Sequence, residues 1–303
     1  MRILFTGIKG QVGGALRGPL ASLGTVLAVD RTLLDLTRPS EIPGILDVIA
    51  PDLIVNPAAY TAVDQAEDEQ ELAYCVNAEA PRAMARWAAS HDIPIVHFST
   101  DYVFNGTGDR PWREDDLTAP LSVYGASKLA GEVAVRNAGG SHLIIRTSWV
   151  FASKGKNFLT TVARLARERR ELRIVADQVG APTSARSLAE GLIAIFGVAA
   201  RDYRSEIARR FEAADGLVHM STSGETSWYG FASAIVDGLR NRGAELAVRS
   251  VIAIQTQEFP TKAVRPHNSR LDMGRLETVL SVRMSNWQDA LDRELDELSG
   301  PGG

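Results

Sequence analysis

The chain has 303 residues, 45% of them hydrophobic, which is enough apolar material for one large domain or two smaller ones. A formal net charge of -4 gives no general electrostatic attraction to nucleic acid or an anionic membrane, so a small-molecule partner is expected. Cys75 is the only cysteine, which excludes an internal disulfide and a zinc site built from cysteine pairs.

The apolar runs favour a cytoplasmic protein. The longest convincing run, residues 192–200, is far shorter than the roughly 20 residues that span a bilayer, and it predicts a buried helix. The opening MRILFTG passes from a strand-like run directly into glycine, without the pattern of an export signal. We therefore expect a cytoplasmic location, with no membrane and no nucleic acid as partner.

Short β-branched runs alternate with helical segments through the first half of the chain. The predicted strands are residues 2–6, 25–29, 53–56, 94–100 and 142–148. Segments with apolar residues at helical spacing include 13–23, 78–91 and 126–137. This alternation is typical of an α/β protein with a Rossmann-type, doubly wound parallel sheet covered by helices on both faces.

The first chemical motif is TGIKGQVGGAL at residues 6–16, which places Gly7, Gly10 and Gly13 between the first strand and the first helix. Residues without a β-carbon let backbone N–H groups approach a pyrophosphate, and the helix N-terminus favours its charge. A glycine-rich turn in an ordinary α/β protein is the alternative. The strand before and the helix after the loop favour a dinucleotide site.

The second predicted strand leads to Asp30, twenty residues beyond Gly10. An acidic side chain at this point binds the adenosine ribose hydroxyls and favours NAD. Arg31 follows directly, and its guanidinium is suited to the 2′-phosphate of NADP. The sequence thus permits NAD, NADP or both.

Tyr124 and Lys128 are spaced i, i+4, which makes them neighbours on one helix face. A lysine charge there favours the phenolate and brings a phenol with a pKa near 10 closer to neutral pH. Thr100 ends the fourth strand, at the sheet edge where α/β proteins bind ligands, and its hydroxyl suits a substrate oxygen. Two residues on a helix surface are the alternative, but after a dinucleotide loop and a strand ending in Ser99-Thr100 the arrangement resembles that of the short-chain dehydrogenases/reductases.

Three polar residues near this trio have competing interpretations. For His97, on an apolar strand, a core position is favoured over a catalytic one. Asp101 follows Thr100 and suits acid–base work, or else caps a turn. Glu132 is one helical turn beyond Lys128 and is interpreted as an exposed i, i+4 partner.

The strand–helix rhythm loosens after about residue 149, which predicts a dinucleotide-binding domain at 1–148 and a mainly substrate-binding domain at 149–303. Residues 216–220 are a candidate strand that returns to the first sheet. Residues 177–187 have the composition of a loop, and the charged segment 201–216 is interpreted as a solvated excursion, with a helix as one alternative. The glycine-rich end of the chain, 299–303, is expected to be disordered.

Seven motifs spread over almost the whole chain resemble the dTDP-4-dehydrorhamnose reductase family of the extended short-chain dehydrogenases/reductases. They are GIKGQVG (7–13), NPAAYTAVDQAE (56–67), STDYVFNG (99–106), PLSVYGASKLAGE (120–132), RTSWVF (146–151), DQVGAPT (177–183) and RPHNSRL (265–271). The resemblance implies a Rossmann domain with a smaller C-terminal substrate domain. It also implies reduction of the C4 ketone of dTDP-4-dehydro-β-L-rhamnose by NADPH or NADH, giving dTDP-β-L-rhamnose.

The resemblance also implies roles for single residues. Thr100, Tyr124 and Lys128 match the catalytic trio, which also contacts substrate and cofactor. The matching cofactor contacts are Gly7, Gly10, Gln11, Val12, Gly13, Asp30, Arg31, Ala58, Ala59 and Tyr60. The matching substrate contacts are Asp101, Trp149, Arg265, His267 and Asn268.

Two positions depart from the family pattern. Members can pair through magnesium held by acidic side chains, but Ala15 and Arg186 stand at aligned positions here. We therefore expect no resident metal, activity without magnesium, and a monomer or homodimer without a magnesium bridge. Two alternatives stay open for the function: a reductase or epimerase for another 4-keto-6-deoxy sugar nucleotide, and a non-catalytic dinucleotide-binding regulatory subunit.

Overall fold

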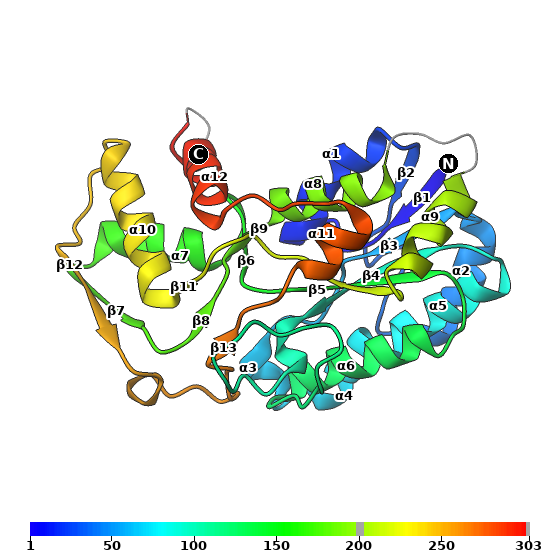
Figure 1. The fold of residues 1–303 in the computed structure, drawn as a ribbon, viewed down its shortest axis with the longest axis horizontal. Coiled ribbons are helices and arrows are strands. Elements are labelled where there is room, and N and C mark those ends of the chain that lie inside the picture. The colour runs from blue at the N-terminus through cyan, green and yellow to red at the C-terminus, as the bar shows by residue number, and fades with distance from the viewer. Residues whose placement is uncertain (198–202, 301–303) are drawn as a thin grey trace.

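The computed structural model describes residues 1–197 and 203–300, and its centre is a six-stranded sheet (Figure 1). All neighbouring strands of this sheet are parallel, in the order β10-β5-β4-β3-β1-β2. They are β1 (Arg2–Phe5), β2 (Thr25–Ala28), β3 (Leu53–Asn56), β4 (Ile95–Thr100), β5 (His142–Thr147) and β10 (Leu217–His219). The predicted fold class is confirmed, and the five predicted strands lie within one residue of their expected bounds. Strand β10 confirms that the segment at 216–220 returns to the first sheet.

Helices cover both faces of this sheet because successive strand residues face opposite sides. Ile3 and Phe5 of β1 pack with one set of helices, whereas Leu4 packs with the other. The first set is α1 (Gln11–Ala21), α8 (Ala185–Phe196), α9 (Tyr203–Ala213) and α11 (Gly274–Leu280). The second set is α2 (Ile42–Ile49), α5 (Ala80–Ser90) and the end of α6 (Val123–Arg136). Shorter turns between them are η1 (Pro39–Glu41), α3 (Val63–Ala66), α4 (Gln70–Tyr74), the π-helical η2 (Cys75–Glu79) and η3 (Asp101–Val103).

A smaller lobe, at the left of Figure 1, has its own apolar core. Its helices are α7 (Phe158–Glu168), α10 (Trp228–Asn241) and α12 (Trp287–Ser299). Its short strands and single 3₁₀ turn are β6 (Val150–Phe151), β7 (Glu171–Val175), β8 (Val179–Gly180), β9 (Thr183–Ser184), β11 (Thr226–Ser227), β12 (Ser250–Ile254), η4 (Thr256–Glu258) and β13 (Asn268–Ser269). The segment predicted as a loop at 177–187 therefore contains β8, β9 and the start of α8. A domain boundary at residue 148 stays a prediction.

The apolar run at 192–200 and the charged segment at 201–216 lie next to each other in the chain. Leu192 and Ile195 are buried on α8, as predicted for the first part, while residues 198–202 lie outside the described part of the chain. Helix α9 is not solvated on all sides, because Ile207 and Phe211 are buried against the large sheet. Among the described residues, no helix combines the length and apolar character needed to cross a bilayer.

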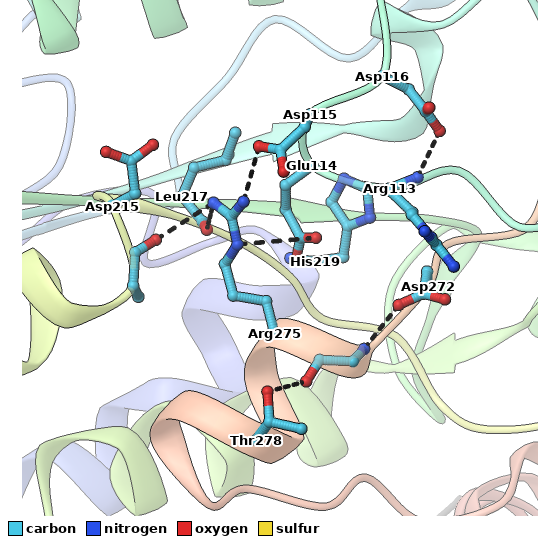
Figure 2. A network of polar contacts seen from close by, with 12 residues as sticks. Arg113, Glu114, Asp115, Asp116, Asp215, Leu217, His219, Asp272, Arg275 and Thr278 are labelled. Atoms are coloured by element: carbon cyan, nitrogen blue, oxygen red, sulfur yellow. Dashed lines mark hydrogen bonds and ion pairs between the residues drawn. The ribbon is translucent and has the colours of Figure 1, made fainter.

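A polar network fastens the loop at 113–116 to the edge of the large sheet (Figure 2). Arg275 of α11 donates to the Asp115 carboxylate at 2.7 Å and to the Leu217 carbonyl at 3.3 Å. Glu114 accepts a 2.9 Å hydrogen bond from the backbone N–H of His219 on β10. Burial raises the pKa of the Glu114 carboxyl above its usual range. The network thus connects α11, β10 and this loop, on the side of the sheet away from β2.

Candidate active site

A cleft of about 1070 Å³ borders the carboxyl ends of the central strands. The chain runs from β1 to β2 on one side and then crosses back to β3 on the other side of β1, so the strand order reverses at β1, and α/β proteins bind ligands at such a switch point. The cleft is lined by every predicted cofactor residue except Tyr60: Gly7, Gly10, Gln11, Val12, Gly13, Asp30, Arg31, Ala58, Ala59, Tyr124 and Lys128. Residues far apart in the sequence are therefore brought together along one wall.

The glycine loop fits a dinucleotide pyrophosphate because the turn requires glycine. Gly7 has φ +63°, in the left-handed region. A β-carbon on Gly13 would lie 1.9 Å from the Gly7 carbonyl oxygen, so α1 can start this close to the loop only with glycine there. Within the described chain, the first turn of α1 has no acidic side chain, and Gly10 provides no capping side chain. The free N–H groups and the dipole at the N-terminus of α1 therefore face the cleft, where they can bind an anion.

Asp30 lies at the far end of the same wall. Its Oδ1 accepts hydrogen bonds from the backbone N–H and the hydroxyl of Thr32, at 3.0 and 2.5 Å. These bonds lower the pKa of the Asp30 carboxyl, helped by Lys9, whose Nζ lies 3.6 Å from Oδ2. Arg31 points to Asp35, with 3.9 Å between Nε and Oδ1. An ionised carboxylate and two exposed cations thus surround the predicted adenosine ribose site.

Residues 57–61 form the floor where β3 ends. Ala58 and Ala59 line the cleft, but the side chain of Tyr60 does not. The Tyr60 hydroxyl donates to Glu69 at 2.8 Å, and its backbone is held by the Asn77 side chain. The hydroxyl, the N–H and the carbonyl of Tyr60 are thus all engaged within the protein, and its contact with the dinucleotide stays a prediction.

Tyr124 begins the first turn of α6, close to Thr100 at the end of β4. Burial raises the pKa of the Tyr124 phenol to about 12, and the Thr100 hydroxyl opposes this by hydrogen bonding. The ring of Tyr102 packs edge-on against that of Tyr124, with 5.6 Å between centroids. The spacing to Lys128 predicted a favoured phenolate. In the structure the desolvated phenol keeps its proton and is set up as a proton donor.

Lys128 lies one turn beyond Tyr124 and is buried. Its Nζ donates to the Phe98 carbonyl at 2.6 Å and lies 3.3 Å from Nε2 of His97. Burial lowers the pKa of Lys128 to about 8, while Glu132 favours its charged form. His97 is completely buried, and burial holds its pKa well below its usual range, so the imidazole is neutral. His97 therefore lies in the core, as expected, but in contact with the trio.

Asp101 is buried beside Thr100. Its Oδ1 accepts from the Thr100 hydroxyl at 3.1 Å, whereas Oδ2 has no hydrogen-bond partner among the described residues. Burial raises the pKa of Asp101 to about 7, and the hydroxyls of Ser269 and Thr100 offset this only in part. The turn is capped by Thr100, which accepts from the Tyr102 N–H, and not by the Asp101 side chain.

Glu132 is buried, contrary to the exposed position expected from its spacing to Lys128. Arg146 on β5 donates to both of its carboxylate oxygens, at 2.9 and 2.6 Å, and Ser99 donates at 2.5 Å. The partner that buries Glu132 comes from a strand, which helical spacing could not indicate. This buried ion pair fastens α6 to β4 and β5.

Trp149 lies where the chain passes from the large sheet to the smaller lobe. Its φ of +48° is in the left-handed region, which is unusual for an aromatic residue. The ring stacks on Trp228 with 3.7 Å between centroids and 12° between planes. A β-carbon on Gly180 would approach this ring to 2.8 Å. The indole is thus held between two elements of the smaller lobe.

Arg265 belongs to a strap, residues 261–269, that connects the smaller lobe to the large one. Both of its terminal nitrogens bond to the Asp64 carboxylate, at 3.0 and 2.8 Å, and this pairing lowers the pKa of Asp64 to about 2. Lys262 of the strap pairs with Asp68. These two ion pairs dock the strap on α3 and the turn that follows it.

The other two predicted substrate residues of the strap have different environments. His267 is largely exposed, and its Nδ1 donates to the Asp177 carbonyl at 2.9 Å. Asn268 is buried and donates to the Arg110 carbonyl at 2.8 Å, while its oxygen accepts from Arg270. Neither lines the main cleft, and their substrate roles stay predictions.

Several cleft residues were missed by the sequence analysis. Lys9 lies inside the glycine motif and lines the cleft, but in the sequence its positive charge alone suggests that it could contact a cofactor. The basic loop after Phe151 also reaches the cleft, through Ser153, Lys154 and Lys156. Other lining residues that the sequence did not predict include Thr6, Leu34, Leu36, Thr61 and Thr147. Hydroxyl and aliphatic side chains such as these have no spacing rule that identifies them.

Arg186 and Ala15, the two departures from the family pattern, both line the cleft. The guanidinium of Arg186 pairs with Glu294, at 3.4 Å, and with Glu297. The second oxygen of Glu294 accepts from the Ser153 N–H at 2.6 Å. Across residues 1–197 and 203–300, no three His, Cys, Asp or Glu side chains are arranged to hold a metal ion.

Comparison with known proteins agrees with this geometry. Residues 1–299 match the family described as the RmlD substrate binding domain. A dTDP-4-dehydrorhamnose reductase of Burkholderia thailandensis is 46% identical over 96% of this chain and 97% of its own. One of Escherichia coli is 43% identical over 98% of both chains. The crystal structure of dTDP-4-dehydrorhamnose reductase from Bacillus anthracis in complex with NADP has a TM-score of 0.85 and 33% identity, covering 98% of this chain and 99% of that one.

Proposed function

The chain belongs to the RmlD substrate binding domain family, and we propose that within it the chain is an NAD(P)H-dependent reductase of dTDP-4-dehydro-β-L-rhamnose. The product is dTDP-β-L-rhamnose, a nucleotide sugar. The observation that carries this proposal is the pair formed by half-buried Tyr124, which lines the dinucleotide cleft, and buried Thr100 beside it, in a chain that matches reductases over nearly its full length. The enzyme is an oxidoreductase.

The glycine loop and the N-terminus of α1 bind the pyrophosphate of NADPH or NADH, and Asp30, Lys9 and Arg31 contact its adenosine end. Lys128, one turn from Tyr124, binds the nicotinamide ribose. When bound, the reduced nicotinamide supplies the hydride for the C4 ketone.

The proton comes from the chain itself. Tyr124 donates its phenolic proton to the developing C4 alkoxide, because burial keeps the phenol protonated at neutral pH. In this structure the Thr100 hydroxyl donates its one hydrogen to Oδ1 of Asp101, and with substrate bound it would turn to donate to the same C4 oxygen, so that two donors stabilise the developing charge. The Tyr124 phenolate then takes a proton from solvent.

On the sugar-nucleotide side, we propose that Trp149 packs on the sugar with the part of its ring that Trp228 and Gly180 leave uncovered, and that Arg265 binds the diphosphate while it remains paired with Asp64. Oδ2 of Asp101 is buried and has no hydrogen-bond partner among the described residues, and we propose that substrate binding brings a sugar hydroxyl to it. We propose further contacts by His267 and Asn268, a cytoplasmic location, and a monomer or homodimer that binds neither nucleic acid nor membrane.

The test is NAD(P)H oxidation by the purified protein with a panel of 4-keto-6-deoxy sugar nucleotides. We expect stoichiometric oxidation of the cofactor with dTDP-4-dehydro-β-L-rhamnose. An epimerase or dehydratase would return the hydride and leave added cofactor unconsumed. A regulatory subunit would bind the cofactor without turnover, and either result would overturn the proposal.

A further inference from the structure

Four buried polar side chains form a continuous chain beneath the cleft, from β1 to α6. The Thr6 hydroxyl donates to Oδ1 of Asn56 at 2.6 Å. Nδ2 of Asn56 lies 3.2 Å from Nδ1 of His97, and Nε2 of His97 lies 3.3 Å from Nζ of Lys128. All four side chains are buried, and the two ends, Thr6 and Lys128, line the cleft.

The direction of these hydrogen bonds fixes the proton on the His97 ring. Because Oδ1 of Asn56 accepts from Thr6, its amide NH₂ group faces the ring and donates to Nδ1 of His97 at 3.2 Å. The Asn56 backbone carbonyl favours a ring proton instead, and we assign Nδ1 as the acceptor on the direct contact with the amide. A neutral imidazole carries one proton, so that proton lies on Nε2. The histidine therefore presents an N–H to the nitrogen of Lys128.

This contact distinguishes the two protonation states of Lys128. An ammonium has three donors and no lone pair, so it faces the Nε2–H of His97 as donor against donor. A neutral amine has a lone pair and accepts from the same N–H. The Phe98 carbonyl accepts from Nζ at 2.6 Å in either state. The histidine therefore favours the neutral amine.

Other ionisable groups near Lys128 are few. Glu132, on the next turn, favours the ammonium, but its carboxylate is shared with Arg146. The titratable and charged groups on the elements that pack against Lys128 or against its helix are Tyr124, Glu132 and Arg136 on α6, His97 on β4, Asp101 and Tyr102 on η3, His142 and Arg146 on β5, Arg82 and Arg86 on α5, Glu71 and Tyr74 on α4, Asp64 on α3, and Cys75 and Glu79 on η2. The last two are engaged elsewhere, by the Leu36 and Thr37 carbonyls and by Arg82.

We propose that His97 is a positioning residue for Lys128: Asn56 holds it as the Nε2–H tautomer, and its N–H eases loss of the lysine proton. His97 touches neither substrate nor cofactor in this role and acts only through Lys128. The consequence is an upper pH limit to the reaction, where Lys128 loses the charge that holds the nicotinamide ribose. The proposal rests on the proposed function only where rates are measured, because the rate measurements require the proposed reaction.

The first test reads the tautomer directly. Long-range ¹H–¹⁵N NMR of ¹⁵N-histidine protein separates protonated from unprotonated ring nitrogens, and the His97 signals are assigned by single substitution of the other four histidines. We expect a proton on Nε2 and none on Nδ1. A ring with its proton on Nδ1 overturns the proposal, and this measurement needs neither substrate nor turnover.

The second test changes the partner of the ring. Asn56→Asp keeps the side-chain shape but offers only acceptors, so His97 must donate from Nδ1 and accept at Nε2 from the ammonium. We expect the midpoint of the Lys128 titration, read by ¹⁵Nζ NMR and by the alkaline limb of kcat/KM, to rise by about one pH unit or more, a tenfold change in the acid constant.

The new carboxylate also favours the ammonium by its charge alone, so the control is the same substitution in a His97→Phe background. We expect a clearly smaller rise there, because the ring nitrogen is gone. Equal rises in both backgrounds would show charge acting alone and overturn the coupling. Should His97→Phe not fold, the wild-type tautomer decides. If the NMR shows the His97 proton on Nε2 but the protein turns over no sugar nucleotide, the proposed function is wrong and this inference still holds.

Discussion

The cofactor wall of the cleft, residues 6–13 and 57–59 with the start of α6, and the strap at 261–269 are held by different interactions. The wall depends on backbone geometry, such as the φ of Gly7 and the close approach of Gly13 to the Gly7 carbonyl, and on the buried groups beneath it. The strap depends on ion pairs with residues about 200 positions earlier, as between Arg265 and Asp64.

This difference shows that the conformation of the wall depends on residues that are neighbours in the sequence, whereas the position of the strap depends on the complete fold. A glycine loop between a strand and a helix has one main structural use, so its conformation follows from a short segment. An ion pair between distant residues exists only once both lobes are in place. We therefore expect substitutions in the two regions to alter different kinetic constants.

The largest effect is expected at Tyr124. Tyr124→Phe removes the proton donor while keeping the ring and its packing on Tyr102, so turnover should fall by roughly 10²–10⁴-fold, the usual contribution of a positioned acid. Cofactor affinity, measured by fluorescence titration, should be unchanged. Near-normal kcat with normal folding would remove Tyr124 from the chemistry.

Asp101 is expected to make stability depend on pH. Its pKa is raised to about 7 in the folded protein, so between about pH 4 and 7 the folded state binds the proton more strongly than the unfolded state. Its contribution is fully present below the unfolded pKa and is lost as the pH rises through 7, by an amount on the order of 4 kcal/mol.

Asp101→Asn removes this titration. Urea unfolding of both proteins at several pH values should show the free energy of unfolding of the wild type falling relative to the variant as pH rises. A difference between the two proteins that stays constant from pH 4 to 8 would contradict the raised pKa of Asp101.

Arg265 tests the strap. Arg265→Met should raise KM for the sugar nucleotide by roughly 10–100-fold with kcat little changed, because a charged hydrogen bond contributes about 1.5–3 kcal/mol. Asp64→Asn keeps a hydrogen-bonding group at α3 and should raise KM less. If neither substitution changes KM, Arg265 serves only to dock the strap.

The sequence predicts much of the fold and the wall for the same reason: both follow from short-range patterns. Strand–helix alternation was sufficient for the parallel sheet. The burial of Glu132 could not be predicted, because its partner Arg146 comes from a separate strand. The buried face of α9 could have been predicted, because Ile207 and Phe211 are spaced i, i+4 within a charged segment. Lys9 lies within a recognised motif, but that motif is defined by its glycines, so a match does not indicate a role for the lysine.

The adenosine end of the wall should show a smaller effect. We expect both NADH and NADPH to be used, since Asp30 favours a ribose hydroxyl whereas Lys9 and Arg31 favour a 2′-phosphate. Lys9→Ala should weaken use of NADPH relative to NADH by about 2–5-fold, as for exposed charge pairs. Asp30→Ala should change the ratio in the opposite direction. Strict exclusion of either cofactor by the wild type would show that one side chain dominates.

The smallest effect is expected from removing magnesium. The side chains that bear on this prediction lie where the wall meets α12. Arg186 already supplies a positive charge between Glu294 and Glu297, and Ala15 has no ligand atom to add. A divalent cation would have to displace the guanidinium from both carboxylates. Chelator treatment should therefore leave both the rate and the mass in solution unchanged. Arg186→Gln is the matched control, because it frees the two carboxylates and should make stability more sensitive to added magnesium. Loss of both activity and assembly from the chelated wild type would refute the metal-free assignment.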